Sequence, residues 1–217
     1  MHKAFIFDMD GVLIHSEPVW ETLEREYLPK VFGAEIAARM GSLVGLGIVD
    51  VVERAQALGS SVGLTEYMPI ALEMAIHVYE SAPITDRIEV LVAHLTSNDF
   101  RLGIVSQSPE EWISRVVPRL SFRDQLDIIV SLQGHSELKR KPSPDGYTYV
   151  MRALTVPADN AFVLEDSNVG IAAGKASGAF TIGYRGNLLP GYEQTGADAY
   201  ADTMDDVIKL VESFDGH

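Results

Sequence analysis

Five short apolar runs, each followed by a loop and a helical pattern, constrain the fold of this chain more than any other feature. Short apolar runs bounded by loops are typical of strands that are buried on both faces of a parallel sheet. The intervening stretches are amphipathic, with apolar residues at helical spacing. The alternation therefore predicts an α/β fold with a doubly wound parallel sheet. The predicted strands are Ala4–Phe7, Leu102–Val105, Ile128–Val130, Ala161–Leu164 and Phe180–Ile182.

One long segment, residues 16–83, interrupts this alternation with helical patterns and no clear strand. Ser16 ahead of Pro18 predicts a helix start, and Gly59–Gly63 predicts a turn between helices. The insert follows the first strand, and ligands of open α/β sheets bind at the carboxyl ends of strands. We therefore expect a small all-helical cap domain at 16–83 and a catalytic core at 1–15 plus 84–217. The alternative is that these helices simply cover the sheet.

The charge and composition of the chain exclude several classes of function. Its 217 residues carry a net charge of −14, which argues against nucleic-acid binding, and they include no Cys, which removes disulfides and thiolate chemistry. No apolar run is long enough to span a membrane, and the N-terminus lacks a secretory pattern. We expect a cytoplasmic protein without a nucleic-acid or membrane partner, as a monomer or weak dimer.

The strongest local signal is Asp8-Met9-Asp10-Gly11, directly after the first predicted strand. Two carboxylates this close together repel each other and favour a bound cation or a shared proton. Hard oxygen ligands of this kind suit Mg²⁺. Gly11 permits a sharp backbone turn beside a ligand. A solvated turn, which also favours Asp and Gly, is the alternative for this motif alone.

Polar side chains also follow two other predicted strands. Ser106 ends the second strand, ahead of a capping-box spacing from Ser108 to Glu111 with Pro109 at the first helical position. We expect Ser108 to cap the helix and Ser106 to lie at a helix N-terminus, where an anion is favoured. The adjacent acids Glu165 and Asp166 end the fourth strand and are further candidate metal ligands.

A dense basic cluster, Lys139–Lys141, stands out in this acidic chain. Lys141 lies just before a predicted helix start at Ser143-Pro144 and can reach a phosphoryl group or an aspartate as a point charge. Lys139 and Arg140 are expected to be solvated.

In this order the motifs resemble those of the haloacid dehalogenase (HAD) superfamily, and the resemblance covers essentially the whole chain. Asp8-Met9-Asp10-Gly11-Val12 resembles its first motif, Ser106 its second, Lys141-Pro142 its third and Glu165-Asp166-Ser167 its fourth. The insert resembles the C1 cap of the β-phosphoglucomutase and phosphatase-like branch. The resemblance implies a Rossmann-like core and a phosphatase that hydrolyses a small phosphorylated metabolite.

The same resemblance implies a role for each residue. Asp8 would be the nucleophile that forms an aspartyl-phosphate, and Asp10 the acid and then the base. Mg²⁺ would be held by Asp8, the carbonyl of Asp10 and Asp166, with Glu165 helping directly or through water. Phosphate-binding roles fall to Ser106, Gln107 and Lys141.

The sequence departs from this branch at three places. His15 stands where an aspartate is usual and is expected to alter hinge hydrogen bonding. Trp20 replaces a cap histidine and is expected to pack in the cap core. The stretch Gly41–Ile48 carries no charge where mutase relatives place an arginine for a second phosphate. A sugar phosphomutase is therefore the second hypothesis, and a receiver-like regulatory module, which is shorter and lacks an insert, is a remote third.

Overall fold

The computed structural model describes residues 2–43 and 46–214. The chain divides into two compact units: Met1–His15 with Pro83–His217, and Ser16–Ala82. The predicted boundary lay between residues 83 and 84, one residue later than the boundary between the two units. It stays a prediction that each unit folds as an independent domain. Within the described residues, no helix is both long enough and apolar enough to cross a membrane.

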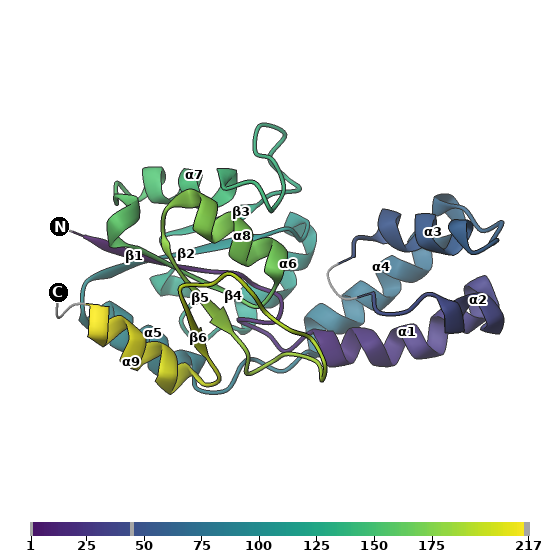
Figure 1. Cartoon of the computed structure of the whole chain (residues 1–217), viewed down its shortest axis with the longest axis horizontal. Coiled ribbons are helices and arrows are strands. Elements are labelled where there is room, and N and C mark those ends of the chain that lie inside the picture. The colour runs from purple at the N-terminus through teal and green to yellow at the C-terminus, as the bar shows by residue number, and fades with distance from the viewer. Residues whose placement is uncertain (1, 44–45, 215–217) are drawn as a thin grey trace. The chain divides into compact units, whose positions relative to one another are not determined.

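The first unit is built on a six-stranded sheet in the order β3-β2-β1-β4-β5-β6, with all neighbours parallel (Figure 1). This confirms the predicted α/β fold with a parallel sheet. The strands are β1 (Lys3–Phe7), β2 (Phe100–Ser106), β3 (Ile128–Ser131), β4 (Ala161–Glu165), β5 (Phe180–Tyr184) and β6 (Ala199–Ala201). The sequence did not predict β6, whose three residues are too few to show a periodicity.

Helices cover the sheet of the first unit on both faces. One side carries α7 (Asp145–Ala153) and α8 (Asn168–Ser177), whose side chains Tyr147, Val150 and Ala173 pack on Ile6, Val105 and Val163 of the strands. On the other side α5 (Ile88–Ser97) lies beside α9 (Met204–Phe214) (Figure 1). The remaining helix, α6 (Glu110–Val116), follows β2. Short 3₁₀ turns occur at Val117–Arg119, Arg123–Gln125 and Ala158–Asn160.

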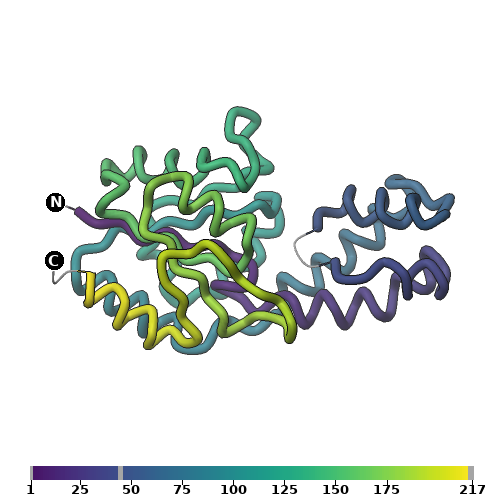
Figure 2. The backbone as a smooth tube through the Cα atoms, viewed as in Figure 1, coloured from purple at the N-terminus to yellow at the C-terminus, as the bar shows by residue number. Residues whose placement is uncertain are grey.

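The path out of the first unit after β1 and back into it can be followed in Figure 2. The outgoing and returning segments pair as a short antiparallel bridge between Ile14 and Ile84. The His15 N–H donates to the Pro83 carbonyl (2.8 Å), and the Thr85 N–H donates to the Leu13 carbonyl (3.0 Å). Burial lowers the pKa of the His15 imidazole. His15 thus contributes its backbone to the pairing of these segments.

The described residues of the second unit form helices and no strand, as the sequence predicted: α1 (Glu17–Phe32), α2 (Ala34–Arg39), α3 (Ile48–Ala57) and α4 (Leu64–Ser81). A side-chain carboxylate caps the N-terminus of two of these helices. At α3 the Asp50 carboxylate accepts from the Gly47 N–H (2.8 Å), and at α4 the Glu66 carboxylate accepts from the Gly63 N–H (2.8 Å). Trp20 packs edge-on against Tyr79 at 6.2 Å, which agrees with its predicted packing role.

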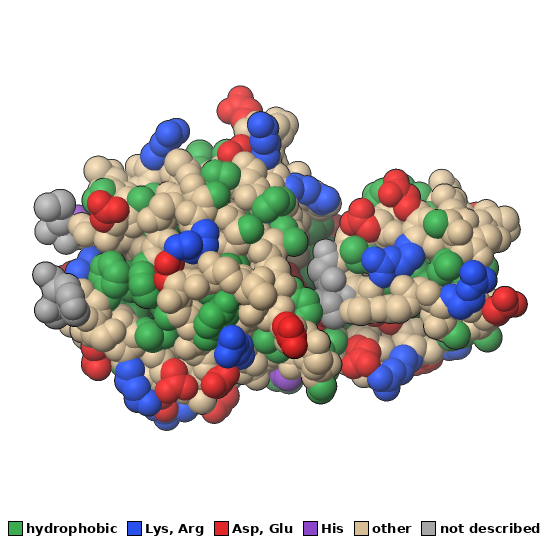
Figure 3. Space-filling view, in the orientation of Figure 1, with side chains coloured by type: hydrophobic (Ala, Val, Ile, Leu, Met, Phe, Trp, Pro, Cys, Tyr) green, Lys and Arg blue, Asp and Glu red, His purple; other side chains and the backbone are tan. Residues whose placement is uncertain are grey.

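The uncharged stretch 41–48 is only partly described, because Val44 and Gly45 lie outside the described residues. Before them, the carbonyls of Met40 and Ser42 accept hydrogen bonds from the Arg54 guanidinium (3.2 and 2.5 Å). On the face of the protein drawn in Figure 3, acidic and basic side chains are interspersed, as expected for a solvated surface.

Candidate active site

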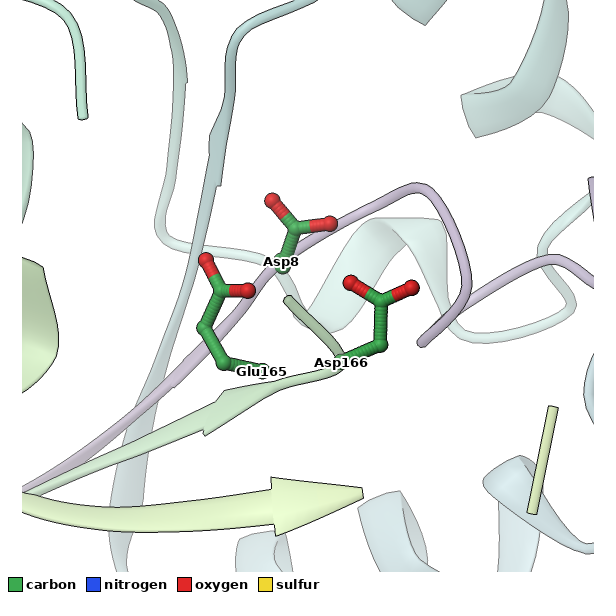
Figure 4. Close-up of side chains that lie close together, drawn as sticks. All are labelled: Asp8, Glu165 and Asp166. Carbon is green, nitrogen blue, oxygen red and sulfur yellow. The ribbon is translucent and has the colours of Figure 1, made fainter. Parts of the chain in front are cut away.

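The predicted polar residues of the first unit gather where three neighbouring strands end. Because β1 lies between β2 and β4 and all three are parallel, their carboxyl ends lie at one edge of the sheet. Asp8 directly follows β1, Ser106 ends β2, and Glu165 ends β4. Figure 4 shows the carboxylates of Asp8, Glu165 and Asp166 turned toward a common space. The strand pairing thus brings together residues that are more than 150 positions apart in the chain.

Lys141 lies between two of these carboxylates. Its ammonium contacts Asp8 Oδ1, and it donates to Glu165 Oε1 (2.5 Å) and to the Val105 carbonyl (3.2 Å). Burial alone would lower the pKa of this ammonium, but the charges of Asp8 and Glu165 outweigh burial and hold the pKa well above its usual range. These three contacts use all three N–H donors of a lysine. Lys141 therefore acts here on the carboxylates, and its predicted contact with phosphate stays a prediction.

Glu165 is fully buried and accepts four hydrogen bonds. Its Oε1 accepts from Lys141 and from the Tyr147 hydroxyl (2.6 Å), and its Oε2 accepts from the N–H and the hydroxyl of Ser167 (3.3 and 3.1 Å). A Cβ at Gly170 would lie 1.9 Å from this carboxyl group, so only glycine fits there. These four bonds use the lone-pair positions of the carboxylate. A metal or a metal-bound water would have to replace one of these donors, so metal ligation by Glu165, directly or through water, stays a prediction.

Three acids of the site have the geometry of a cation site. One oxygen from each of Asp8, Glu165 and Asp166 lies within 4.8 Å of the others. Gly11 has a positive φ of 73°, and a Cβ there would lie 1.9 Å from Asp166 Oδ2. The chain thus turns tightly against Asp166 at the one residue type that permits it. The donor set, hard oxygens in a closely fitted cradle, suits Mg²⁺.

The ionisation of Asp8 is governed by its surroundings. Burial raises the pKa of its carboxyl group, the charges of Glu165 and Asp10 raise it further, and Lys141 opposes them. A bound divalent cation would act in the same direction as Lys141. The site therefore needs positive charge beside Asp8 to keep this carboxylate ionised.

Asp10 lies in the loop that follows β1, and its Oδ2 accepts a hydrogen bond from the Ser108 hydroxyl (2.9 Å). The prediction that Ser108 caps a helix was wrong. The helix α6 begins at Glu110 with Pro109 as its N-cap and has no side-chain cap hydrogen bond. The capping-box spacing is a local pattern, and here the contact with Asp10 prevails. The predicted helix start at Ser143-Pro144 is likewise one residue early, because α7 begins at Asp145 with Pro144 as N-cap.

Ser106 is buried at the end of β2, where its hydroxyl oxygen accepts from the Ser108 N–H (3.0 Å). An oxygen that accepts in this way still has its own proton to donate. Gln107 is partly exposed at the same turn. The phosphate-binding roles of Ser106 and Gln107 remain predictions, and both residues are at the sheet edge where the acids lie.

Comparison with known families fits this arrangement. A family model described as a haloacid dehalogenase-like hydrolase matches residues 2–178, which is most of the chain. The chain belongs to the haloacid dehalogenase-like hydrolase family. The HAD resemblance drawn from the four motifs is thereby confirmed.

Curated relatives that resemble this chain include several phosphatases. Hexitol phosphatase B of Escherichia coli K12 is 30% identical, with 80% of this chain and 79% of the relative aligned. Validoxylamine A 7'-phosphate phosphatase of Streptomyces hygroscopicus is 28% identical, with 84% and 85% aligned. The chain is a phosphoric monoester hydrolase of the HAD family, and the receiver-like alternative is set aside.

Solved structures share the fold over nearly the whole chain. A putative β-phosphoglucomutase from Thermotoga maritima has a TM-score of 0.76 at 21% identity, covering 97% of this chain and 99% of its own. CbbY from Rhodobacter sphaeroides, in complex with phosphate, has a TM-score of 0.72 at 22% identity, covering 95% and 96%. At this level of identity the likeness concerns the HAD fold with its helical insertion.

A loop after β5 holds the acidic turn of the HAD site, and the sequence did not reveal it. The Gln194 amide donates to the carbonyls of Asp166 (2.5 Å) and Tyr184 (2.8 Å). The Tyr192 hydroxyl accepts from the Asn168 N–H (3.0 Å), and the Asn168 amide donates to the Glu193 carbonyl (2.9 Å). This loop therefore fixes the backbone on either side of Ser167.

Tyr147 is the second residue that sequence reasoning missed. It lies on α7, is fully buried, and donates to Glu165. Burial raises the pKa of its hydroxyl group well above its usual value, and the charge of Glu165 adds to this. The hydroxyl therefore stays protonated and remains a donor. An apolar-looking position on an amphipathic helix gave no signal that this aromatic residue carries a polar role.

Proposed function

We propose that this protein is a Mg²⁺-dependent phosphatase that hydrolyses a small phosphorylated metabolite through an aspartyl-phosphate on Asp8. The observation that carries the proposal is the environment of Asp8: a buried carboxylate that contacts the Lys141 ammonium and lies beside Asp166. A carboxylate nucleophile divides one difficult displacement into two easier steps. The phosphatases among the relatives support the same reaction.

In the first step, an Asp8 carboxylate oxygen attacks phosphorus and the ester P–O bond breaks. The Asp10 carboxyl group gives its proton to the departing oxygen, so that an alcohol leaves. Ser106 and Gln107 would orient the phosphoryl oxygens. Lys141 would keep the nucleophile oriented and offset negative charge as it develops.

In the second step, water attacks the phosphorus of the aspartyl-phosphate. The Asp10 carboxylate takes a proton from that water, and the bond between phosphorus and Asp8 breaks. Inorganic phosphate leaves, and Asp8 and Asp10 return to their starting states. The same residue thus serves as acid and then as base.

Asp8 and Asp166, with the carbonyl of Asp10, would hold the Mg²⁺, and Glu165 would act through Lys141 and a water. The bound cation supplies charge stabilisation for the phosphoryl oxygens. A direct test is Mg²⁺ titration of the protein by calorimetry, in which Asp166→Asn should weaken binding about tenfold or more. Chelation with EDTA should remove hydrolysis reversibly, and Ca²⁺ should not restore it because its coordination is looser.

The substrate is proposed to carry one phosphate on an otherwise small molecule such as a sugar or polyol. The uncharged stretch 41–48 supports a single phosphate, because a second buried phosphate would need a charged partner. A panel of sugar phosphates, polyol phosphates, nucleotides and phosphorylated acids would identify it. Release of inorganic phosphate without an isomerised sugar phosphate separates this proposal from a phosphomutase.

The decisive variant is Asp8→Asn, assayed with p-nitrophenyl phosphate and with the best substrate of the panel. We expect hydrolysis to fall below detection while the circular dichroism spectrum is unchanged. Turnover close to that of the wild type would reject Asp8 as the nucleophile.

A further inference from the structure

Ser108 lies at the turn between β2 and α6. Its hydroxyl group does not cap the helix, and its proton is directed to a carboxylate and not to the position expected for a phosphate. The helix begins two residues later and takes no side-chain cap hydrogen bond. The Ser108 hydroxyl instead donates to Oδ2 of Asp10 at 2.9 Å. This contact joins the loop after β2 to the loop after β1 across 98 positions of sequence.

Hydrogen bonds to its backbone hold Ser108 in place. Ser108 is 8% exposed. Its N–H donates to Ser106 Oγ (3.0 Å), and its carbonyl accepts from the Ser131 hydroxyl (2.7 Å). Ser131, which ends β3, is itself oriented by the Gly134 N–H (3.1 Å). Both the N–H and the carbonyl of Ser108 are thus held by serine hydroxyl groups.

The three serines at these strand ends direct their hydroxyl protons to different acceptors. The Ser131 proton goes to the Ser108 carbonyl, and the Ser108 proton goes to Asp10. Ser106 accepts from the Ser108 N–H, which leaves its own proton to donate. Ser108 thus holds the acid, Ser131 holds the backbone, and Ser106 keeps a proton for its proposed contact with phosphate.

We propose that Ser108 is the positioning residue for Asp10 in both proton transfers. The inference rests on the proposed function and adds a role to it. Because Oδ2 accepts the Ser108 hydrogen bond, the proton that moves is carried by Oδ1. It passes from Oδ1 to the leaving oxygen in the first step and returns to Oδ1 from water in the second. A carboxyl group without this restraint samples other rotamers, and small misplacements of a catalytic group cost large factors in rate.

A leaving-group comparison tests the assignment. The variants are Ser108→Ala, which removes the donor, and Ser108→Thr, which retains it. The matched control is Ser114→Ala, which removes an exposed hydroxyl on α6 that donates to the Glu111 carbonyl. The substrates are p-nitrophenyl phosphate, whose leaving group needs little protonation, and the alkyl phosphate that the wild type hydrolyses fastest.

For Ser108→Ala we expect kcat/KM to fall about tenfold or more with the alkyl phosphate and less than about threefold with the aryl ester, because only the first depends on proton donation. We also expect more phosphoenzyme in acid-quenched samples at steady state, because the base step is slowed. Ser108→Thr and Ser114→Ala should keep the ratio of the two kcat/KM values within about threefold of the wild type.

Equal losses with both esters, or a changed ratio in Ser108→Thr as large as that in Ser108→Ala, would overturn the role of Ser108. Unchanged kinetics in Ser108→Ala would overturn it too. Failure of the proposed function looks different, because the wild type itself would then hydrolyse neither ester. Thermal unfolding of each variant verifies that the comparison is made on folded protein.

Discussion

Removing the Lys141 ammonium should destabilise the first unit strongly, because this charge lies between two buried carboxylates. The side chain of Lys141 is 3% exposed, and those of Asp8 and Glu165 are 10% and 0% exposed. Lys141→Met keeps most of the volume and removes the charge. Breaking a buried ion pair by removing one partner costs about 3–5 kcal/mol. We expect a loss of stability of that size at pH 7, with EDTA present so that no cation replaces the ammonium.

A double-mutant cycle shows whether the loss comes from these charges. In a Glu165→Gln background, Lys141→Met leaves one buried carboxylate, Asp8, without its ammonium partner instead of two. Lys141→Met should then cost less, by about 1–3 kcal/mol. The matched control is Lys139→Met in the same loop, where the exposed side chain should change stability by less than about 0.5 kcal/mol.

Urea unfolding followed by fluorescence is the assay. Trp112 lies on α6 in the first unit and Trp20 on α1 in the second, so a Trp20→Phe background restricts the signal to the first unit. A loss below about 1 kcal/mol for Lys141→Met, or the same loss in both backgrounds, would refute the argument that the buried carboxylates depend on this lysine.

Three further predictions concern Glu24 of the helical insert, Gly11 beside the candidate metal ligand Asp166, and Gln194, which binds the Asp166 carbonyl. Burial and the charge of Glu21 raise the pKa of Glu24 from 4.5 to about 7, so the free energy of unfolding is highest below pH 4.5 and falls as the pH rises to 7. Glu24→Gln should therefore stabilise the protein at pH 8 by up to about 3 kcal/mol and leave it unchanged at pH 4, as measured by thermal unfolding. Gly11→Ala should weaken Mg²⁺ binding in calorimetry at least tenfold, because its Cβ would meet Asp166; unchanged affinity would contradict the close approach. Gln194→Ala should raise the Mg²⁺ dissociation constant about threefold to tenfold while KM at saturating Mg²⁺ stays the same, and a change in KM alone would count against a role in holding Asp166.

The strands and the order of the site motifs were predictable because both are local in sequence. An apolar run and the polar residue that ends it are neighbours, and parallel strands place such ends at one edge. The prediction of five strands and a helical insert was therefore correct. Burial was predicted wrongly for β3, which lies at an edge of the sheet and has Ile129 39% exposed. The short strand β6 was missed because Ala199–Ala201 offers too few residues for a pattern.

The connections within the site were not predictable, because they join residues from different elements. Ser108 carries the spacing of a helix cap, and only the fold brings Asp10 within 2.9 Å of it. Tyr147 has the position of a core aromatic, and its hydroxyl role depends on Glu165, 18 residues away. Gln194 lies in a loop without periodicity, 28 residues from the carbonyl that it holds.

The account depends on a covalent bond between phosphorus and Asp8, and this bond can be observed. The Asp10→Asn variant should accumulate the intermediate, because the base that activates water is missing. After an acid quench with p-nitrophenyl phosphate, peptide mass spectrometry should place one phosphoryl group on the peptide that contains Asp8, at that residue. Phosphate on another residue such as Ser106, or burst release of p-nitrophenol with an unmodified Asp8, would contradict the central claim.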